Sequence, residues 1–345
     1  MTNADTDLTL RRIDAPLWDG PWDALAGQSE TSGFMQSSFW AAFKRAEGYT
    51  PHRYGLFRNE TLIGGATFLI YPTADHQPGM LLCPEGPVLP WDDTDITRQG
   101  LRLLLRAAED DIDSALGLRI EPHLPPSKPS VLRNWQRAPL DLAPLHTLML
   151  DLETSDDDLL AQMKPKGRYN LRLAHRHGVT VRQSESCDDI RVFYDLFADT
   201  SRRQEFFGEP FGFFLNLGAT LFPHRHAALF LAEWEGTVLA ASLVLFYGRC
   251  ATYLYGGSSP LHRNVMPCYA LHHAALAEAR RRGCREYDFW GIDPFGQPDH
   301  LYAGFSQFKR QWGGTIVASL GAHDHVFYDR LAGHVLQRLT EGVNA

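Results

Sequence analysis

Apolar and aromatic positions predict two pairs of β-strands, one in each half of the chain. The first pair covers residues 54–58 and 61–71, and the second covers residues 229–234 and 236–247. In each pair a short polar turn separates two runs that are rich in β-branched and aromatic residues. We therefore expect a two-stranded hairpin in each half.

After each hairpin, the apolar spacing predicts a helix and then a short strand that ends in an acidic residue. The helices are expected around residues 97–114 and 266–282, and the strands end at Glu121 and Asp288. The two hairpins also resemble each other in sequence, so an internal duplication explains this order. The pattern predicts an α/β (α+β) fold of two similar units, each with helices flanking a mixed, twisted sheet.

The second half contains a strand–helix–strand unit that can collect a ligand. Its first strand, residues 252–255, is expected to end at Gly256 and Gly257, and its second strand covers residues 286–290. Ligands bind at the C-terminal ends of the strands in such crossover units. The side chains at these ends are Tyr253, Tyr255, Asp288 and Trp290. These side chains form either a ligand-binding site or a packed edge of the hydrophobic core.

The length of the chain, 345 residues, also favours two domains. A proline-rich connection covers residues 122–144, and we place the boundary directly after it. The predicted domains are residues 1–144 with a C-terminal return at 321–345, and residues 145–320. A strand at 315–320 and a helix at 324–339 are expected to complete the fold.

The composition is that of an ordinary globular protein, with 44% hydrophobic and 21% charged residues. Five scattered cysteines indicate reduced thiols rather than disulfides or a zinc site, and the fifteen histidines form no metal motif. No signal peptide and no apolar run of membrane-spanning length is recognisable. The net charge of −8 restricts any contact with nucleic acid to a local patch.

One basic patch stands out, on a predicted helix over residues 155–174 that Pro165 is expected to kink or split. Between residues 164 and 182 there is no Asp or Glu, so these cations have no local counter-ions. They are Lys164, Lys166, Arg168, Arg172, Arg176 and Arg182. The patch suits the phosphates of a nucleotide-linked ligand or of RNA, and a solvated helix face is the alternative.

The order of hairpin, strand, helix and strand resembles the N-acetyltransferase (GNAT) fold. Proteins of this fold that bind acetyl-coenzyme A hold its pyrophosphate with glycine-rich backbone amides where the helix begins. Here that loop, residues 261–267, has no glycine, and Pro267 has no amide hydrogen. We therefore expect no coenzyme A and no other cofactor.

Six short motifs, in order between residues 34 and 321, resemble the Fem family of FemA/FemB/FemX-type peptidyltransferases. The motifs lie at residues 36–44, 166–179, 200–203, 253–258, 287–292 and 308–309. The resemblance implies two tandem GNAT-like domains. It also implies transfer of Gly, Ala or Ser from aminoacyl-tRNA to the stem-peptide amine of a UDP-linked or lipid-linked muramyl pentapeptide.

The interval from residue 203 to 229 is too short for the coiled-coil arm that some members carry. The chain therefore resembles the compact FemX-like form. We also expect a monomer without an integral membrane segment, and the reduced thiols place it in the cytoplasm.

The same resemblance implies the binding residues. Lys44 and Arg203 match the cations that hold the diphosphate of the sugar nucleotide. Tyr253 or Tyr255 matches the aromatic lining, and Phe308 also falls in a motif at the substrate site.

The chemistry requires no covalent intermediate, because the aminoacyl ester is already activated. It requires a positioned neutral amine and a donor for the developing oxyanion. By resemblance Lys309 is that donor, while Glu121 or Asp288 accepts the proton of the amine. Relatives carry Asp where this chain has Glu121, which leaves its role open, and Asp288 can alternatively hold a loop.

Two other functions are compatible with the sequence. One is an N-acyltransferase of the same fold that uses an acyl-coenzyme A or an acyl carrier. The other is a non-catalytic protein that binds a sugar nucleotide or RNA.

Overall fold

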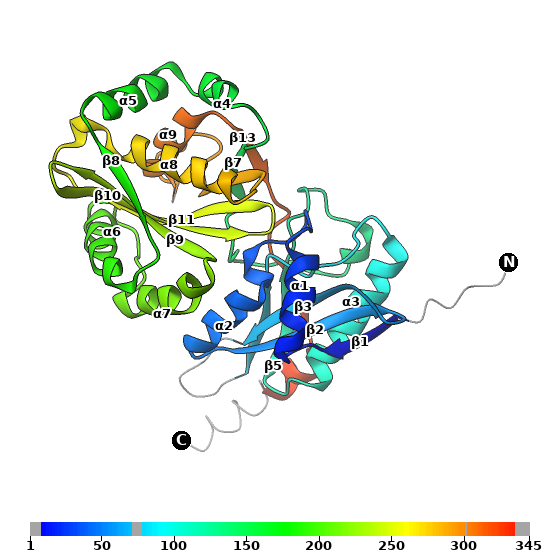
Figure 1. The fold of residues 1–345 in the computed structure, drawn as a ribbon. Helices are drawn as coiled ribbons and strands as arrows, with labels where there is room; N and C mark the ends of the chain where they lie inside the picture. Colours follow the sequence, from blue (N-terminus) through cyan, green and yellow to red (C-terminus); the bar gives the residue numbers. More distant parts are fainter. Residues whose placement is uncertain (1–7, 71–77, 301, 335–345) are drawn as a thin grey trace. The chain divides into compact units, whose positions relative to one another are not determined.

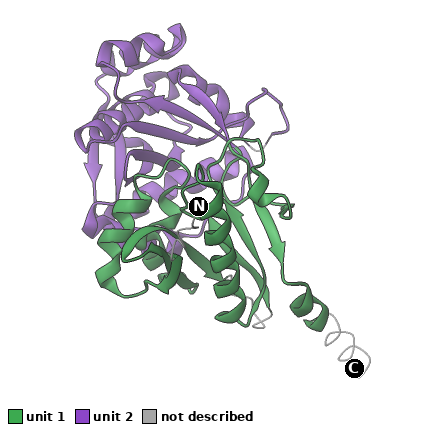
Figure 2. Ribbon diagram, turned by 90° about the vertical axis from the view of Figure 1, so that its right-hand side faces the viewer, with its two compact units in different colours: residues 1–145, 319–345 green, residues 146–318 purple. Residues whose placement is uncertain are grey.

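The computed structural model describes residues 8–70, 78–300 and 302–334 (Figure 1). The chain divides into two compact units, which are residues 1–145 with 319–345, and residues 146–318 (Figure 2). Each unit has its own seven-stranded sheet and its own hydrophobic core. The architecture is the predicted α/β (α+β) fold with helices flanking mixed sheets.

The sheet of the first unit has the strand order β1-β2-β3-β4-β5-β14-β6. Parallel pairing joins β4 to β5, and the other neighbouring strands are antiparallel. In sheet order the strands are β1 (Leu8–Arg12), β2 (Thr50–Arg58), β3 (Thr61–Ile70), β4 (Gly79–Pro84), β5 (Ala115–Glu121), β14 (His323–Val326) and β6 (Gln136–Arg137).

Strand β14 comes from the end of the chain and inserts between β5 and β6, so the C-terminal return completes the first sheet. The predicted helix at 324–339 is therefore wrong at its beginning, where Asp324 lies in a strand. A helix at residues 328–334 follows, and the rest of the prediction lies outside the described residues.

Three α-helices of the first unit are α1 (Asp19–Ala26), α2 (Ser38–Ala46) and α3 (Thr94–Asp110). Helix α2 begins directly after Ser37, whose hydroxyl accepts a hydrogen bond from the Trp40 N–H at 3.1 Å and so caps the helix. Trp40 and Phe43 lie on its buried face. Strand β4 was not predicted, since its short apolar run between Gly79 and Pro84 has no clear alternation.

The sheet of the second unit has the strand order β13-β7-β12-β11-β10-β9-β8. In sheet order the strands are β13 (Thr315–Ala318), β7 (His146–Asp151), β12 (Glu286–Gly291), β11 (Cys250–Ser258), β10 (Thr237–Tyr247), β9 (Ala227–Trp234) and β8 (Thr180–Ser184). Strands β11 and β12 are parallel, as the crossover prediction requires, but they pair only between residues 250–252 and 286–288. The two strands are therefore unpaired with each other toward their C-terminal ends, where a ligand can enter.

Strand β11 continues through Gly256 and Gly257, so the prediction that these residues end it is wrong. A Cβ atom at Gly257 would lie 2.4 Å from the backbone of Leu196 and Phe197. The glycine is thus required by the close approach of a helix rather than by a turn.

The helices of the second unit cover both faces of its sheet. Figure 1 shows α6 and α7 on one side, and α5 and α8 on the other. Pro165 is the first residue of α5, which confirms the predicted split of the 155–174 helix. The helices are α4 (Asp156–Gln162), α5 (Pro165–Arg176), α6 (Ile190–Gln204), α7 (Phe211–Leu221), α8 (Pro267–Arg281) and α9 (Ala303–Lys309). No helix among the described residues is both long and apolar enough to cross a bilayer.

Candidate functional site

A cavity of about 230 Å³ lies in the second unit, beside the end of β11 that no longer pairs with β12 and beside the first turns of α8. Side chains from α6, β11, α8 and α9 line it, and the loop before α8 closes one part of its wall. Three of the predicted binding residues, Arg203, Tyr253 and Phe308, line this cavity together. Their convergence from α6, β11 and α9 supports the predicted site within this unit.

The side chains of Tyr253 and Tyr255 lie in different surroundings because β11 contains a bulge. The neighbouring residues Leu243 and Val244 of β10 pair with Tyr255 and Tyr253, which leaves Leu254 as the extra residue. Tyr253 consequently lines the cavity, whereas the Tyr255 ring packs against an aromatic cluster of α6 and α7. Of the two tyrosines, the structure favours Tyr253 as a ligand-contacting residue.

Lys309 is the last residue of α9 and is only 6% exposed. Its Nζ donates a hydrogen bond to the Gly291 carbonyl at 2.7 Å and lies 5.8 Å and 5.9 Å from the ring centroids of Tyr253 and Tyr302. Burial lowers the pKa of Lys309 to about 7, and the negative charge of Asp288 opposes that shift. Near neutral pH the side chain is therefore present in both protonation states.

Asp288 is a buried acid on β12 with a local structural contact. Its carboxylate accepts the Trp290 N–H at 2.7 Å, and Trp290 has a left-handed φ of 64°. The acid thus supports an unusual backbone turn and also favours the charged form of Lys309.

His272 is a residue of the cavity wall that the sequence did not single out. It lies on α8, is 1% exposed, and its Nδ1 lies 3.1 Å from the Tyr287 hydroxyl. Burial and the charge of Lys309 lower the pKa of His272 to about 3, so its imidazole is neutral. Its ring also meets that of Tyr253 edge to face at 4.5 Å, which fixes the tyrosine against the cavity.

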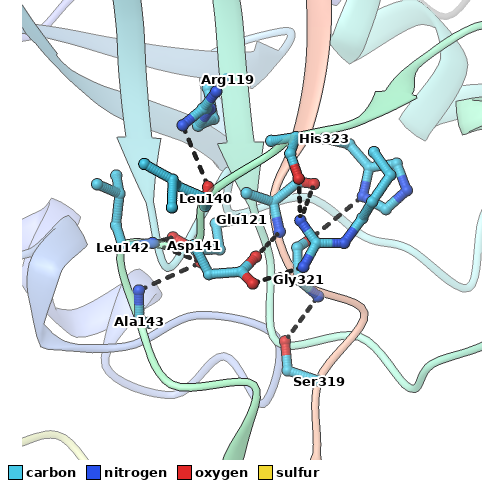
Figure 3. Close-up of polar contacts among 12 residues, drawn as sticks. Arg119, Glu121, Leu140, Asp141, Leu142, Ala143, Ser319, Gly321 and His323 are labelled. Atoms are coloured by element: carbon cyan, nitrogen blue, oxygen red, sulfur yellow. Dashed lines mark hydrogen bonds and ion pairs between the residues drawn. The ribbon is translucent and has the colours of Figure 1, made fainter. Parts of the chain in front are cut away.

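Glu121 lies at the end of β5 in the first unit and is 2% exposed. Its Oε1 accepts the backbone N–H groups of Leu142 and Ala143 at 3.0 Å and 3.2 Å (Figure 3). Burial raises the pKa of Glu121 to about 8, although both N–H donors favour the carboxylate. These contacts give Glu121 a role in holding the loop before the domain boundary.

Lys44 also belongs to the first unit, on α2. Its Nζ lies 5.3 Å, 5.2 Å and 4.9 Å from the ring centroids of Trp40, Phe43 and Tyr49, so three aromatic faces surround the ammonium. Trp40 precedes Lys44 by about one helical turn, so the two side chains lie on the same side of α2.

The basic patch on α5 is smaller than predicted. Arg182 pairs with Asp189 and Glu233, each at 2.6 Å, so the expectation that it lacks counter-ions is wrong. Arg168 donates to the Ala161 carbonyl at 2.8 Å and thereby caps the end of α4. The exposed cations that remain are Lys164, Lys166, Arg172 and Arg176.

The loop before α8 lacks the free backbone amides that usually bind the pyrophosphate of coenzyme A in this fold. The N–H groups of Val265 and Met266 bond to the carbonyls of His262 and Arg263 within the loop, and Pro267 has no N–H. The amides of Val265 and Met266 are therefore not available to a pyrophosphate. Among the described residues, no group of three or more His, Cys, Asp or Glu side chains could hold a metal ion.

Comparison with known proteins defines the class of fold first. Residues 165–310 match the family model described as an acetyltransferase (GNAT) domain. A tandem GNAT protein from the clavulanic acid biosynthesis pathway superposes with a TM-score of 0.54 at 11% identity, over 93% of this chain and 98% of that chain. The protein is thus built from two tandem GNAT-like domains.

Three further similarities concern the Fem family. Residues 21–128 match the FemAB family model. The crystal structure of FemX superposes with a TM-score of 0.82 at 20% identity, over 91% of this chain and 97% of that chain. The lipid II:glycine glycyltransferase of Staphylococcus aureus (strain MRSA252) is 22% identical over an alignment of 403 positions, which covers 92% of this chain and 94% of the relative. The chain is therefore similar to members of the Fem family over most of its length.

Proposed function

We propose that this protein is an aminoacyltransferase that moves an amino acid from aminoacyl-tRNA to the side-chain amine of a muramyl stem peptide. The observation that carries the proposal is the buried Lys309 beside a cavity lined by Arg203, Tyr253 and Phe308. The relative named lipid II:glycine glycyltransferase supports a lipid-linked acceptor and a role in building interpeptide bridges. We place the reaction in the cytoplasm, where the five free cysteines stay reduced.

The proposed reaction is direct transfer from one carrier to the other. The amine of the acceptor forms a C–N bond to the ester carbonyl, and the C–O bond to the ribose then breaks. The amine loses a proton and the departing ribose oxygen gains one. Because the ester is already activated, the protein has to position both groups and stabilise the negative charge on the carbonyl oxygen.

Lys309 is the proposed donor to that oxygen. One of its three N–H bonds is directed to Gly291, which leaves two for substrate atoms. The charge of Asp288 supports the ammonium form that donation requires.

Asp288 or Glu121 is the proposed acceptor of the proton from the amine, directly or through water. We favour Asp288, because it acts electrostatically on Lys309, whereas the Glu121 carboxylate is held by two backbone N–H groups. Arg203 and Lys44 are proposed to hold phosphate groups of the acceptor.

The exposed cations of α5 are the proposed contact for the tRNA backbone. This helix is linked to the segment that follows Lys309, since the Lys164 N–H bonds to the Gln311 carbonyl at 3.0 Å. A Cβ atom at Gly167 would lie 2.5 Å from the same carbonyl, so α5 approaches this segment as closely as backbone allows. A tRNA backbone bound along α5 would therefore extend toward Lys309.

Incubation of the protein with a panel of charged tRNAs and with lipid-linked or UDP-linked muramyl pentapeptide tests the proposal. We expect the mass of one acceptor to increase by one aminoacyl residue, and we expect no product when acetyl-coenzyme A replaces the tRNA. Absence of product with every charged tRNA, or acetylation by acetyl-coenzyme A, would contradict the proposal.

A further inference from the structure

His272 of α8 is a buried polar side chain that has no part in the reaction described so far. Its imidazole is 1% exposed and forms part of the wall of the cavity. Aromatic rings enclose it, with the ring centroids of Phe289, Phe308 and Trp312 at 5.0 Å, 5.4 Å and 5.9 Å from its own. A polar ring in such surroundings is costly unless its nitrogen atoms have hydrogen-bond partners.

The contact with Tyr287 determines which nitrogen of His272 carries the hydrogen. Tyr287 is fully buried on β12, and burial raises the pKa of its hydroxyl, which therefore keeps its proton. The hydrogen-bond partner of this hydroxyl among the described residues is Nδ1 of His272, at 3.1 Å. The hydroxyl therefore donates to Nδ1, because the opposite direction would leave a buried O–H without an acceptor. A neutral imidazole carries one hydrogen, which must then be on Nε2.

The Nε2–H group of His272 is a donor available to a ligand. In the part of the chain that the structure describes, Nδ1 is the ring nitrogen that has a hydrogen-bond partner, and Nε2 has none. Because the imidazole forms part of the cavity wall, an acceptor atom in the cavity can bind to Nε2. The ring is a poor base, since burial and the charge of Lys309 lower its pKa to about 3. It can therefore donate a hydrogen bond, but it cannot take the proton of the amine.

His272 and Lys309 act on the same part of the site. The charge of Lys309 contributes to the lowered pKa of His272. Both groups approach Tyr253, whose ring centroid lies 4.5 Å from the imidazole centroid and 5.8 Å from Nζ of Lys309. A carbonyl oxygen has two lone pairs, so it can accept from an ammonium and from an imidazole at the same time. An oxyanion that forms beside Tyr253 would therefore meet one charged donor and one neutral donor.

We propose that the Nε2–H of His272 is a second hydrogen-bond donor to the carbonyl oxygen of the reacting ester, beside Lys309. This role rests on the proposed function, which assigns the ester as the substrate. No proton is transferred in it, because the hydrogen stays on Nε2 while the negative charge on the oxygen forms and disappears. Tyr287 is a positioning residue, since its hydroxyl keeps the hydrogen of His272 on Nε2.

Transfer kinetics of three variants test this role. His272→Leu removes the donor and should lower kcat by about a hundredfold, with little change in KM for aminoacyl-tRNA, because the bond strengthens only as the oxyanion forms. His272→Gln places an amide N–H near the position of Nε2 and should keep a kcat roughly tenfold above that of His272→Leu. Tyr287→Phe should lower kcat less than His272→Leu does, since the hydrogen is then shared between Nδ1 and Nε2.

His273→Leu is the matched control. His273 is the next residue on α8, is half-buried, and contacts the ring of His175 rather than lining the cavity. Its replacement should leave kcat at the wild-type value. Melting temperatures of all four variants separate a lost donor from a lost fold. A kcat of folded His272→Leu equal to that of His273→Leu would overturn the proposal.

NMR of the full chain with nitrogen-15-labelled histidine tests the donor without any need for activity, and it decides the matter if His272→Leu does not fold. In the wild type we expect hydrogen on Nε2 alone and no titration of His272 between about pH 5 and about pH 8. In Tyr287→Phe we expect hydrogen on both nitrogens. A saturating amount of 3′-aminoacyl-adenosine amide, a stable analogue of the ester, should shift the Nε2–H signal.

Hydrogen on Nδ1 in the wild type would overturn the proposal, and so would an Nε2–H signal that the bound analogue leaves unchanged. A wild type that shows the expected spectra but transfers no amino acid from any charged tRNA would contradict the proposed function. In that case His272 would still be supported as a donor to the aminoacyl group.

Discussion

At the scale of single residues, the site depends on a lysine kept away from water. Burial lowers the pKa of Lys309 to about 7, and a nearby acid opposes that shift. A carbonyl group accepts a hydrogen bond from its Nζ, and two tyrosine rings lie close to the same atom. Sequence motifs identified this lysine, Arg203, Tyr253 and Phe308, and the structure brings the last three to one cavity. They did not reveal His272, whose position depends on contacts of α8 with the more distant strands β11 and β12.

Replacing Lys309 by methionine should lower kcat by about a hundredfold or more, because the oxyanion loses its charged donor. The affinity for the muramyl precursor should change little, since Arg203 and Lys44 are the proposed phosphate contacts. Steady-state kinetics and calorimetry separate the two effects. A variant with the turnover of wild type would remove Lys309 from the mechanism.

The same substitution should change how stability depends on pH. The pKa of Lys309 is about 7 in the folded protein and 10.5 for a lysine side chain in water, so the unfolded chain binds more protons between these values. The wild type therefore gains free energy of unfolding, relative to Lys309→Met, as pH rises from about 7 toward 10.5, and it loses that gain as pH falls through about 7. Urea denaturation at several pH values measures the difference, and parallel curves for both proteins would contradict the lowered pKa.

At the scale of elements, hydrophobic patterning predicted the hairpin of each unit, helix α3, and the crossover of β11, α8 and β12. The errors have physical causes that lie outside local sequence. Gly257 looks like a strand terminator but admits the backbone of α6, and one extra residue in β11 separates Tyr253 from Tyr255. Asp324 lies in a strand rather than a helix, because β5 and β6 supply its pairing partners.

Gly257→Ala should destabilise the protein by about 2–4 kcal/mol, since the new methyl group would meet the Leu196–Phe197 backbone at 2.4 Å. Gly212→Ala in α7 is the control, because a Cβ atom there has no neighbour within 4 Å. That control should be neutral or slightly stabilising, as expected for alanine in a helix. Equal melting temperatures for the two variants would show that α6 can move away from β11.

At the scale of the whole molecule, the first unit is assembled from both ends of the chain. Arg119 of β5 and Asp324 of β14 form a largely buried ion pair at 2.7 Å, with side chains 12% and 15% exposed. The loop that contains Asp141 also contacts the C-terminal segment of the first unit, since Asp141 accepts the Ala322 N–H at 2.7 Å (Figure 3).

Ending the chain after residue 318 should therefore destabilise the first unit selectively. Strand β5 would lose its antiparallel partner and Arg119 would be left without its acid, which is costly for a buried charge. Limited proteolysis should cut within residues 8–145 while residues 146–318 stay protected, and the full-length chain is the control. Equal protection of both units in the shortened chain would show that β14 is dispensable.

The insertion of β14 also has a consequence for how the protein is made. Arg119 and Asp324 are 205 residues apart in the chain, and the whole second unit is encoded between them. On the ribosome N-terminal segments emerge first, so the sheet of the first unit cannot be completed until the second unit and β14 have been synthesised. An incomplete edge at β5 is therefore exposed during most of synthesis, and this interval is the one in which a chaperone would be of use to the nascent chain.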